Sequence, residues 1–459
     1  MFVPQRFNPT QKSLCQFYVG KTIYNVPKPC LVLDRAKMRR HCQSLSAAAD
    51  ALGVDFRAHV KTHKTVQGTR LQVDKAQNVK LVASTIAEIE HLLPLLAEYQ
   101  DQGRCVNVLY GIPLPQSQVS RLAAVGRKLG KRGLSVLVDH ADQLKHLTRF
   151  HDEAGFPAGV YVKVDTGYHR AGLPPWGMNK DSLLSKLVVL DQQGTVDFVG
   201  LYSHSSLSYN DSTPAQAMAN LEDEITGCIE ALARNAELFP KSKTLTISVG
   251  ASPQVSSIEN LVTESGKLSP AAQSLHAAMQ AVSDSRPYGV QTSLELHAGV
   301  YSILDVQQLA TNSRAKLGGC EDEIAISVVS EVCSVYNDGE REQSEALISA
   351  GVLALGREPC AAYRGWGVVD CSTFASEVVA GRQIIVSRVS QEHSILEWDS
   401  HSEGYEINPL PLTVGQSIRI YPNHACITGA LYGWYLVVDS DLSGRETQIV
   451  DVWCRASGW

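Results

Sequence analysis

The chain has 459 residues, of which 44% are hydrophobic and 19% charged, a composition typical of a globular protein and a length that predicts two domains. A formal net charge of −6 with scattered lysine and arginine argues against a nucleic-acid partner, and no apolar run approaches the roughly 20 residues that a membrane helix needs. Eleven cysteines, an odd number spread along the chain, and an N-terminus without a secretory pattern predict free thiols and a cytoplasmic location.

The first two thirds of the sequence alternate short runs of β-forming residues with helical segments. A short strand is expected at Cys30 to Leu33, and Asp34 stands where the N-cap of the next helix should be. Eight further strands are predicted at residues 54–60, 79–83, 105–110, 134–138, 159–164, 197–203, 245–249 and 292–296. Eight strand–helix units are typical of a (β/α)8 barrel, but an open doubly wound sheet shows a similar alternation.

The pattern changes near residue 320, where helical periodicity gives way to strand-like runs separated by turns. These runs cover residues 323–336, 382–390, 393–399, 416–422, 433–439 and 447–455. They predict an antiparallel β domain, with a boundary between residues 310 and 322. The chain is therefore divided into an N-terminal segment (1–29) that packs with the β domain, a barrel (30–315) and the β domain itself (316–459).

In a parallel barrel the groups that follow the strands gather at one end, where active sites lie. The groups found there are Lys61, Ser84, Thr85, Tyr110, Asp139, His140, Asp165, His204, Ser252 and Gly299. Lys61 follows the first strand within RAHVKTHKT (57–65). A lysine at a barrel mouth loses part of its hydration, which lowers its pKa and suits a Schiff-base amine. The alternative is that these basic residues belong to a solvated loop.

A second motif, His424-Ala425-Cys426, lies near the C-terminus in PNHAC. On a strand, residues two apart face the same side, so both side chains could reach one metal ion. Imidazole with thiolate suits Zn²⁺, and two protein ligands leave positions open for water or substrate. Taken alone, this spacing is a weak signal.

Residues 57–65 resemble the cofactor-lysine segment of the D-threonine aldolase and eukaryotic-type D-serine dehydratase family. Other segments resemble that family in the same order: VKVDTGYHRAGL, LYSHSSLSY, VGASP, ELHAGVYSILDVQQ, VSRVSQEHSIL and PNHACITGALYGWYLVVD. The resemblance runs from about residue 28 to the end. It implies an α/β fold, namely an alanine-racemase-like (β/α)8 barrel that binds pyridoxal phosphate (PLP), followed by an antiparallel β domain. It also implies a homodimer.

By this resemblance Lys61 carries PLP as a Schiff base, and Lys64 is the weaker candidate. Glycine turns after the last two strands let backbone N–H groups approach a phosphate. The cofactor-binding residues implied there are Gly250, Ser252, Gly299 and Tyr301. The family usually reads Gly-Ser-Thr-Pro at the first turn, whereas this chain has Ala251, which leaves Ser252 as the best side-chain donor.

The resemblance also implies contacts around the PLP ring and the substrate. His204 stands where alanine racemases have a ring-stacking histidine, and His297 stands where they have an arginine at the pyridine nitrogen. Since that cation is missing, Tyr202 and Tyr209 are candidates for contacts with the ring or its nitrogen. A neutral partner would make PLP a weaker electron sink, which suits β-elimination. Arg170 is a candidate for the substrate carboxylate, with pairing to Asp165 as an equal alternative.

Finally, the resemblance implies that His424 and Cys426 hold zinc beside the PLP. The aldolases have aspartate at the second ligand position, so Cys426 favours the dehydratases. The expected reaction is PLP- and zinc-dependent β-elimination of a β-hydroxy-D-amino acid, with D-serine giving pyruvate and ammonia. The first alternative is retro-aldol cleavage, as in D-threonine aldolase. The others are a non-catalytic PLP-binding protein and a structural zinc module without cofactor.

Overall fold

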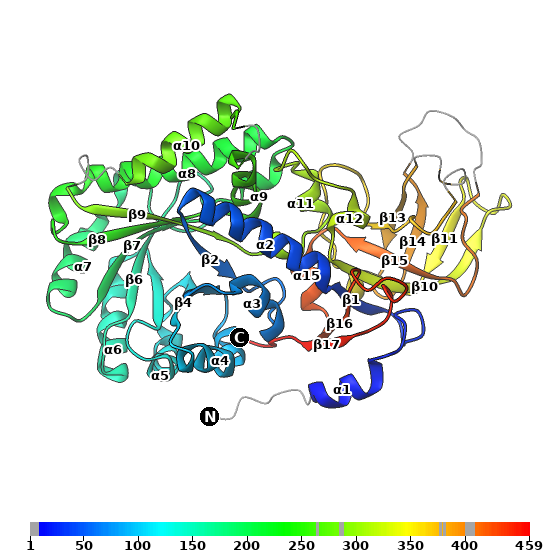
Figure 1. Cartoon of the computed structure of the whole chain (residues 1–459), viewed down its shortest axis with the longest axis horizontal. Helices are drawn as coiled ribbons and strands as arrows, with labels where there is room; N and C mark the ends of the chain where they lie inside the picture. The colour runs from blue at the N-terminus through cyan, green and yellow to red at the C-terminus, as the bar shows by residue number, and fades with distance from the viewer. Residues whose placement is uncertain (1–8, 263–265, 284–288, 376–378, 380–381, 400–408) are drawn as a thin grey trace. The chain divides into compact units, whose positions relative to one another are not determined.

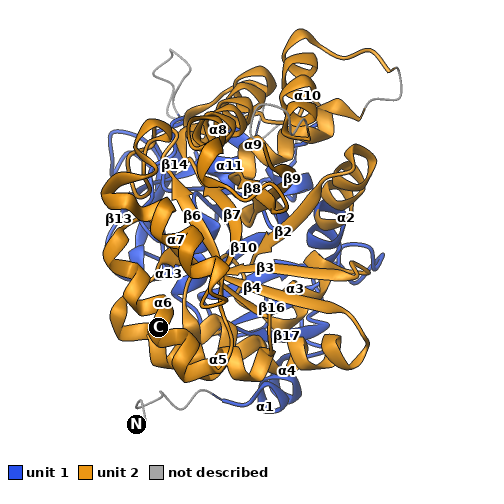
Figure 2. Cartoon of the chain, turned by 90° about the vertical axis from the view of Figure 1, so that its left-hand side faces the viewer, with its two compact units in different colours: residues 1–41, 302–310, 316–455 blue, residues 42–301, 311–315, 456–459 orange. Residues whose placement is uncertain are grey.

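The computed structural model describes residues 9–262, 266–283, 289–375, 379, 382–399 and 409–459 (Figure 1). The chain forms two compact units (Figure 2). Unit 1 comprises Met1–His41, Ser302–Ala310 and Lys316–Arg455, and unit 2 comprises Cys42–Tyr301, Thr311–Ala315 and Ala456–Trp459. The three-segment division at residues 29/30 and 315/316 stays a prediction.

Unit 2 contains a closed barrel of eight parallel strands, which confirms the predicted (β/α)8 fold and excludes the open sheet. The strands are β2 (Asp55–His59), β3 (Asn78–Ala83), β4 (Cys105–Pro113), β5 (Leu134–Val138), β6 (Gly159–Val164), β7 (Asp197–Ser203), β8 (Thr244–Val249) and β9 (Gln291–Ala298). β9 pairs with β2 and closes the barrel, with Arg57 opposite His297. The predicted bounds differ from these by at most three residues.

Helices connect the barrel strands and surround them in Figure 2. They are α2 (Arg35–Leu52, which begins in unit 1), α3 (Val66–Val73), α4 (Ile86–Asp101), α5 (Val119–Leu129), α6 (Leu144–Ala154), α7 (Leu183–Gln192), α8 (Pro214–Arg234), α9 (Ser252–Ser256) and α10 (Pro270–Val282). α4 shows why they begin where they do. The Thr85 hydroxyl accepts the N–H of Glu88, and the Glu88 carboxylate accepts the N–H of Ser84, so two orphan donors are satisfied.

Unit 1 contains a nine-stranded sheet in the order β11-β14-β13-β12-β15-β10-β1-β16-β17. The strands are β1 (Cys30–Asp34), β10 (Ile326–Tyr336), β11 (Glu345–Ile348), β12 (Gly367–Val369), β13 (Ile384–Val389), β14 (Ser394–Trp398), β15 (Ser417–Pro422), β16 (Trp434–Val438) and β17 (Asp451–Cys454). β10 pairs with both β11 and β15, so six strands close into an antiparallel barrel. This confirms the predicted antiparallel β domain, whose closure was not predicted. β11 and β12 were not predicted because so few residues give no periodic signal.

The N-terminal residues belong to the core of unit 1. α1 (Gln11–Tyr18) buries Leu14, which packs in one cluster with Ile23, Val26, Leu436 and Val452. Short helices complete the unit: α11 (Val306–Ala310), α12 (Cys320–Glu323), α13 (Val352–Leu355) and α15 (Ala425–Ala430). Among the described residues, no helix combines the length and apolar character needed to cross a membrane. All eleven cysteines are free thiols.

Candidate active site

Lys61 lies in the turn between β2 and α3 at the C-terminal end of the barrel. The turn is fixed by His63, whose Nδ1 lies 3.1 Å from the Thr65 hydroxyl and whose Nε2 lies 2.8 Å from Gln72. Among the described residues, the Lys61 ammonium has no hydrogen-bond or ion-pair partner. The Lys64 ammonium, in contrast, forms a 3.0 Å ion pair with Glu88, a carboxylate that is fully buried. Lys61 is therefore the amine of this turn that remains available for a carbonyl compound.

Two turns at the same end of the barrel form a cradle for an anion. The Ser252 hydroxyl oxygen accepts hydrogen bonds from the N–H groups of Gly299 (3.2 Å) and Tyr301 (3.1 Å). A Cβ at Gly299 would lie 3.0 Å from the carbonyl oxygen of His59, so this close approach favours glycine. Converging N–H groups with a serine hydroxyl are the donors that a phosphate needs. These residues fit the phosphate of PLP.

Gly250 and His204 are joined at the adjacent strand ends. Gly250 has a φ of +140°, and a Cβ there would lie 2.4 Å from Val255 and 2.6 Å from the carbonyl oxygen of His297. Its own carbonyl oxygen lies 2.6 Å from His204 Nδ1, so this ring nitrogen donates. Burial, together with Lys61 and other nearby cations, holds the pKa of His204 well below its usual range. The imidazole is therefore a neutral ring, suited to lie against a cofactor.

The tyrosines predicted from the sequence lie in different environments. Tyr202 is buried on β7 and its ring stacks on His297, with centroids 4.2 Å apart and planes at 6°. Tyr209 lies on a 3-10 turn, Leu207–Asn210, and is partly exposed. The ring of Tyr301 packs edge-on against Phe56 and its hydroxyl bonds Cys42, so only its backbone N–H serves the cradle.

Arg170 is exposed, and its guanidinium lies 5.0 Å from the ring centroid of Tyr168. The predicted alternative, pairing with Asp165, is wrong: that carboxylate binds His169 instead, with 2.9 Å between His169 Nδ1 and Asp165 Oδ2. Arg170 is close enough to help lower the pKa of His204, although its effect is smaller than the effects of burial, Lys61, His297 and Lys163. Its positive charge therefore belongs to the barrel mouth and is free to meet a carboxylate.

Lys163 is a site residue that sequence reasoning missed. It lies on β6, 6% exposed, with its ammonium 5.2 Å from the ring centroid of Tyr202. Burial lowers its pKa, while Glu224 opposes that effect. Burial also raises the pKa of Glu224 to about 7. The available signal was a lysine in a strand whose six residues are otherwise apolar or glycine.

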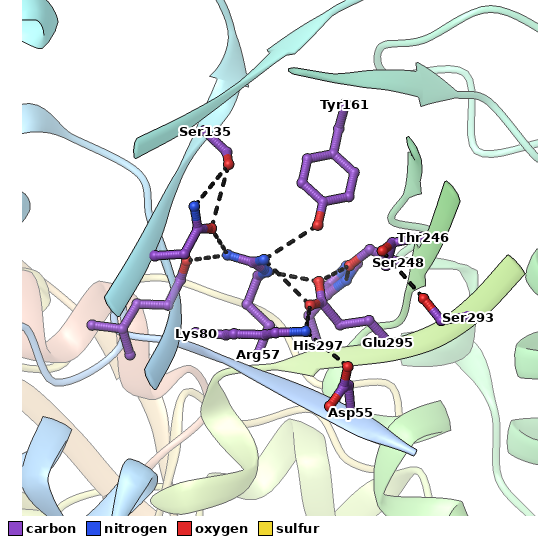
Figure 3. Close-up of polar contacts among 12 residues, drawn as sticks. Asp55, Arg57, Lys80, Ser135, Tyr161, Thr246, Ser248, Ser293, Glu295 and His297 are labelled. Atoms are coloured by element: carbon purple, nitrogen blue, oxygen red, sulfur yellow. Dashed lines mark hydrogen bonds and ion pairs between the residues drawn. The ribbon is translucent and has the colours of Figure 1, made fainter. Parts of the chain in front are cut away.

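Beneath the mouth, charged side chains fill the barrel interior (Figure 3). The guanidinium of Arg57 donates to Glu295 at 2.7 Å and 3.2 Å, to Asn107 at 2.7 Å and to the Tyr161 hydroxyl at 3.2 Å. Lys80 binds the same Glu295 carboxylate at 2.9 Å. Burial opposes ionisation of Glu295, but these two cations lower its pKa to about 2. The carboxylate is therefore charged at neutral pH.

The predicted metal pair lies in unit 1 at the start of α15. The prediction that both residues lie on a strand is wrong: β15 ends at Pro422, His424 is the N-cap, and Cys426 is in the first helical turn. The Asp305 carboxylate, which accepts the N–H of Ala425 at 2.7 Å, holds this turn. The two side chains nevertheless meet, because His424 is hydrogen-bonded to Cys426.

The electrostatics of this pair favour a cation. Burial opposes protonation of His424, but Cys426, Asp305 and Glu358 raise its pKa to about 9. Among the described residues, no group of three or more histidine, cysteine or acidic side chains could hold a metal ion. An imidazole and a thiol in contact fit a zinc ion that keeps open positions for water or substrate.

Two family models match the chain. Residues 33–262 match the N-terminal domain of alanine racemase, and residues 325–438 match a putative serine dehydratase domain. A D-serine dehydratase of Schizosaccharomyces pombe is 33% identical over 98% of this chain and 97% of its own length. One from Saccharomyces cerevisiae is 30% identical over 96% of this chain and 98% of its own length.

Solved structures share the fold. D-threo-3-hydroxyaspartate dehydratase from Delftia sp. HT23 is 25% identical, with a TM-score of 0.70 over 95% of this chain and all of the other. A cysteine-to-alanine variant of a D-threo-3-hydroxyaspartate dehydratase, in the metal-free form, has a TM-score of 0.69 at 24% identity over 96% of this chain and all of that one. The chain therefore belongs to the D-serine dehydratase family of alanine-racemase-like, PLP-dependent ammonia-lyases.

Proposed function

We propose that the protein deaminates a β-hydroxy-D-amino acid by PLP- and zinc-dependent β-elimination, with D-serine giving pyruvate and ammonia. The observation that carries the proposal is the Lys61 ammonium, which has no partner among the described residues and lies at the mouth of the barrel that this family shares. The full-length similarity to two D-serine dehydratases supports the choice of substrate.

Lys61 would hold the cofactor carbonyl carbon, and Ser252 with the N–H groups of Gly299 and Tyr301 would hold its phosphate. Bound PLP supplies an electron sink for the α-carbon of the amino acid. The amine of Lys61, released when substrate binds, takes the α-proton as general base. The guanidinium of Arg170 meets the substrate carboxylate as a charge-assisted bidentate pair.

His424 and Cys426 would hold zinc, which supplies a Lewis acid for the β-hydroxyl group. Hydroxide is a poor leaving group, so stabilising its negative charge is the task that the metal pair performs. The Cα–H and Cβ–O bonds break, which releases water and 2-aminoacrylate. Addition of water to aminoacrylate then gives pyruvate and ammonia, so the atoms of D-serine are accounted for.

The deciding experiment is incubation of the purified protein with a panel of β-hydroxy-D-amino acids, with keto acid, ammonia, glycine and aldehyde measured separately. We expect keto acid and ammonia in equal amounts from D-serine, and none from L-serine. Aldehyde with glycine would instead establish the retro-aldol reaction, which a 28% identity to a D-threonine aldolase over 41% of the chain keeps as the second candidate. No product from any member of the panel would contradict both reactions and support a non-catalytic PLP protein.

We further propose a cytoplasmic homodimer, in line with the eleven free thiols and with the subunit pairing of alanine-racemase-like enzymes. Sedimentation should show twice the 49.9 kDa mass of one chain at micromolar concentration. A fully active monomer would contradict the dimer.

A further inference from the structure

Glu224 lies on helix α8, outside the strand-end turns that form the cofactor site, and it is only 1% exposed. The Ser203 hydroxyl donates to Glu224 Oε1 at 2.9 Å, and the side-chain amide of Gln254 donates to Oε2. The backbone N–H of Ser205 donates to the same carboxyl group. These three donor residues are buried as well, so one carboxyl group joins the end of β7 to α9.

Each of the two joined segments carries a residue of the proposed cofactor site. The two serines flank His204, and Gln254 follows Ser252 by two residues within the same helix. A shift of either segment would therefore displace a group that is assigned to the cofactor. Glu224 holds both segments from one common point.

Helix α9 has little local support of its own. It has five residues, far fewer than the roughly 12–15 that an isolated helix needs, and its N-cap, Ala251, has no side-chain oxygen to cap it. A helix this short takes its position from tertiary contacts. The Gln254 amide turns its N–H toward Glu224, because an ionised carboxylate can only accept, and its Oε1 is left buried without a hydrogen-bond partner among the described residues.

The buried carboxyl group costs stability. Burial raises the pKa of Glu224 to about 7, although Ser203 and Lys163 oppose this effect. Since the same group ionises near pH 4.5 in the unfolded chain, its ionisation lowers the stability of the barrel as the pH rises from 4.5 to 7. A group that costs stability and still joins two functional segments indicates a role in function.

We propose that Glu224 is a positioning residue, which fixes the spacing between the His204 segment and the Ser252 segment through its three hydrogen bonds. The inference rests on the proposed function, because it requires PLP at the mouth of the barrel. The bond to Gln254 serves the phosphate, since α9 begins with Ser252. The bonds to the two serines serve the cofactor ring, since β7 leads into His204.

The test compares the affinities of the whole chain for PLP and for pyridoxal, which lacks the phosphate, in alkaline buffer where Glu224 is ionised. Gln254→Met keeps the length of the side chain but removes the bond to Glu224. Its affinity for PLP should fall by about tenfold, the effect of one lost hydrogen bond to a charged group, whereas its affinity for pyridoxal should stay unchanged. Glu224→Ala should weaken the binding of both. An unchanged ratio of the two affinities in Gln254→Met overturns the proposal, and this variant decides the matter if Glu224→Ala does not fold.

Glu224→Gln separates positioning from charge. Its amide can accept from Ser203 and can donate to Gln254 Oε1 once that second amide turns over, so the affinity for PLP should stay close to that of the wild type. A loss as large as in Glu224→Ala would overturn the proposal in favour of charge pairing with Lys163. Ser257→Ala is the matched control, because it removes a bond to the Gln254 carbonyl within the same segment, and it should lower the melting temperature without changing the ratio of affinities. A wild-type chain that binds neither PLP nor pyridoxal would instead refute the proposed function itself.

Discussion

The candidate cofactor residues of unit 2 come from the ends of separate barrel strands, whereas the candidate metal pair of unit 1 comes from one short stretch after β15. Lys61, His204, Ser252 and Gly299 meet only because the barrel closes. His424 and Cys426 meet because the first turn of α15 begins between them, held by Asp305. The first arrangement depends on closure of the whole barrel, whereas the second depends on one helical turn and its contact with Asp305.

This difference has consequences for what each site tolerates. The interior of the parallel barrel contains a buried ion pair between Arg57 and Glu295 beneath the mouth, so the cofactor site and the stability of unit 2 are coupled. The candidate metal pair would contribute two ligands, and a metal held by two protein ligands is easily removed. Damage to the barrel should therefore affect folding and cofactor together, whereas damage to the pair should affect one chemical step.

Replacement of Lys61 should have the largest effect. In the wild type, borohydride should trap PLP on Lys61, and Lys61→Ala should lose both this adduct and the activity, at least about 10³-fold, because anchor and base disappear together. Lys64→Ala is the matched control, three residues away in the same turn. It should keep the adduct and lose some stability, because it leaves the buried Glu88 carboxylate without its counter-charge. Peptide mapping that finds the adduct on Lys64 would reverse the assignment.

Metal removal should separate the two sites by chemistry. Chelation, or Cys426→Ala, should lower D-serine turnover by about 10²-fold or more, because a Lewis acid contributes several kcal/mol to departure of hydroxide. β-Chloro-D-alanine, which has a good leaving group, should be turned over to a measurable extent, and the adduct on Lys61 should persist. Cys454→Ala, a thiol of the same unit outside the pair, should behave as wild type. Undiminished D-serine turnover after complete metal removal would contradict the role of the pair, and joint loss of both substrates with the fold would indicate a structural metal.

The sequence predicted the strand ends well and the interior of the barrel poorly. Lys61, His204 and Ser252 could be located because each follows an apolar run, and apolar runs mark strands. Arg57 and Glu295 are 238 residues apart, and nothing local shows that closure of the barrel between β2 and β9 pairs them. The same limit explains the metal pair: its spacing was visible, but the helix that holds it depends on an Asp305 contact 120 residues away.

Removal of the interior carboxylate should destabilise the barrel by an intermediate amount. Glu295→Gln leaves the Arg57 guanidinium and Lys80 without their counter-charge, at a cost of about 3 kcal/mol at neutral pH. Since the pKa of Glu295 is lowered from 4.5 to about 2 in the folded state, its contribution is complete above pH 4.5 and is lost as the pH falls toward 2. The difference in unfolding free energy between variant and wild type should therefore shrink in acid.

Denaturant unfolding between pH 3 and 7 measures this difference. Glu98→Gln is the matched control, because Glu98 forms an ion pair with Arg70 on the surface whose distance, 2.5 Å, is even shorter than the 2.7 Å of the interior pair. Exposed pairs contribute little to stability, so its unfolding midpoint should stay close to that of the wild type. Equal effects of the two substitutions, or a Glu295→Gln deficit that grows in acid, would show that the interior pair does not stabilise the barrel.

Ser252→Ala should have the smallest effect, for a reason specific to the cradle. In the cofactor-free protein the Ser252 hydroxyl accepts the N–H groups of Gly299 and Tyr301, and the variant leaves both without this acceptor. A bound phosphate would satisfy these two N–H groups again, so part of the lost stability is confined to the apoenzyme. The affinity for PLP should therefore weaken by only about tenfold or less, which is the contribution of one hydrogen bond to a charged group. The apoenzyme should melt earlier than the wild type, and PLP should restore most of the difference. Ser257→Ala, which loses a bond to the Gln254 carbonyl in the same segment, should lower the melting temperature without this rescue. If PLP rescued both variants equally, Ser252 would have no specific part in phosphate binding.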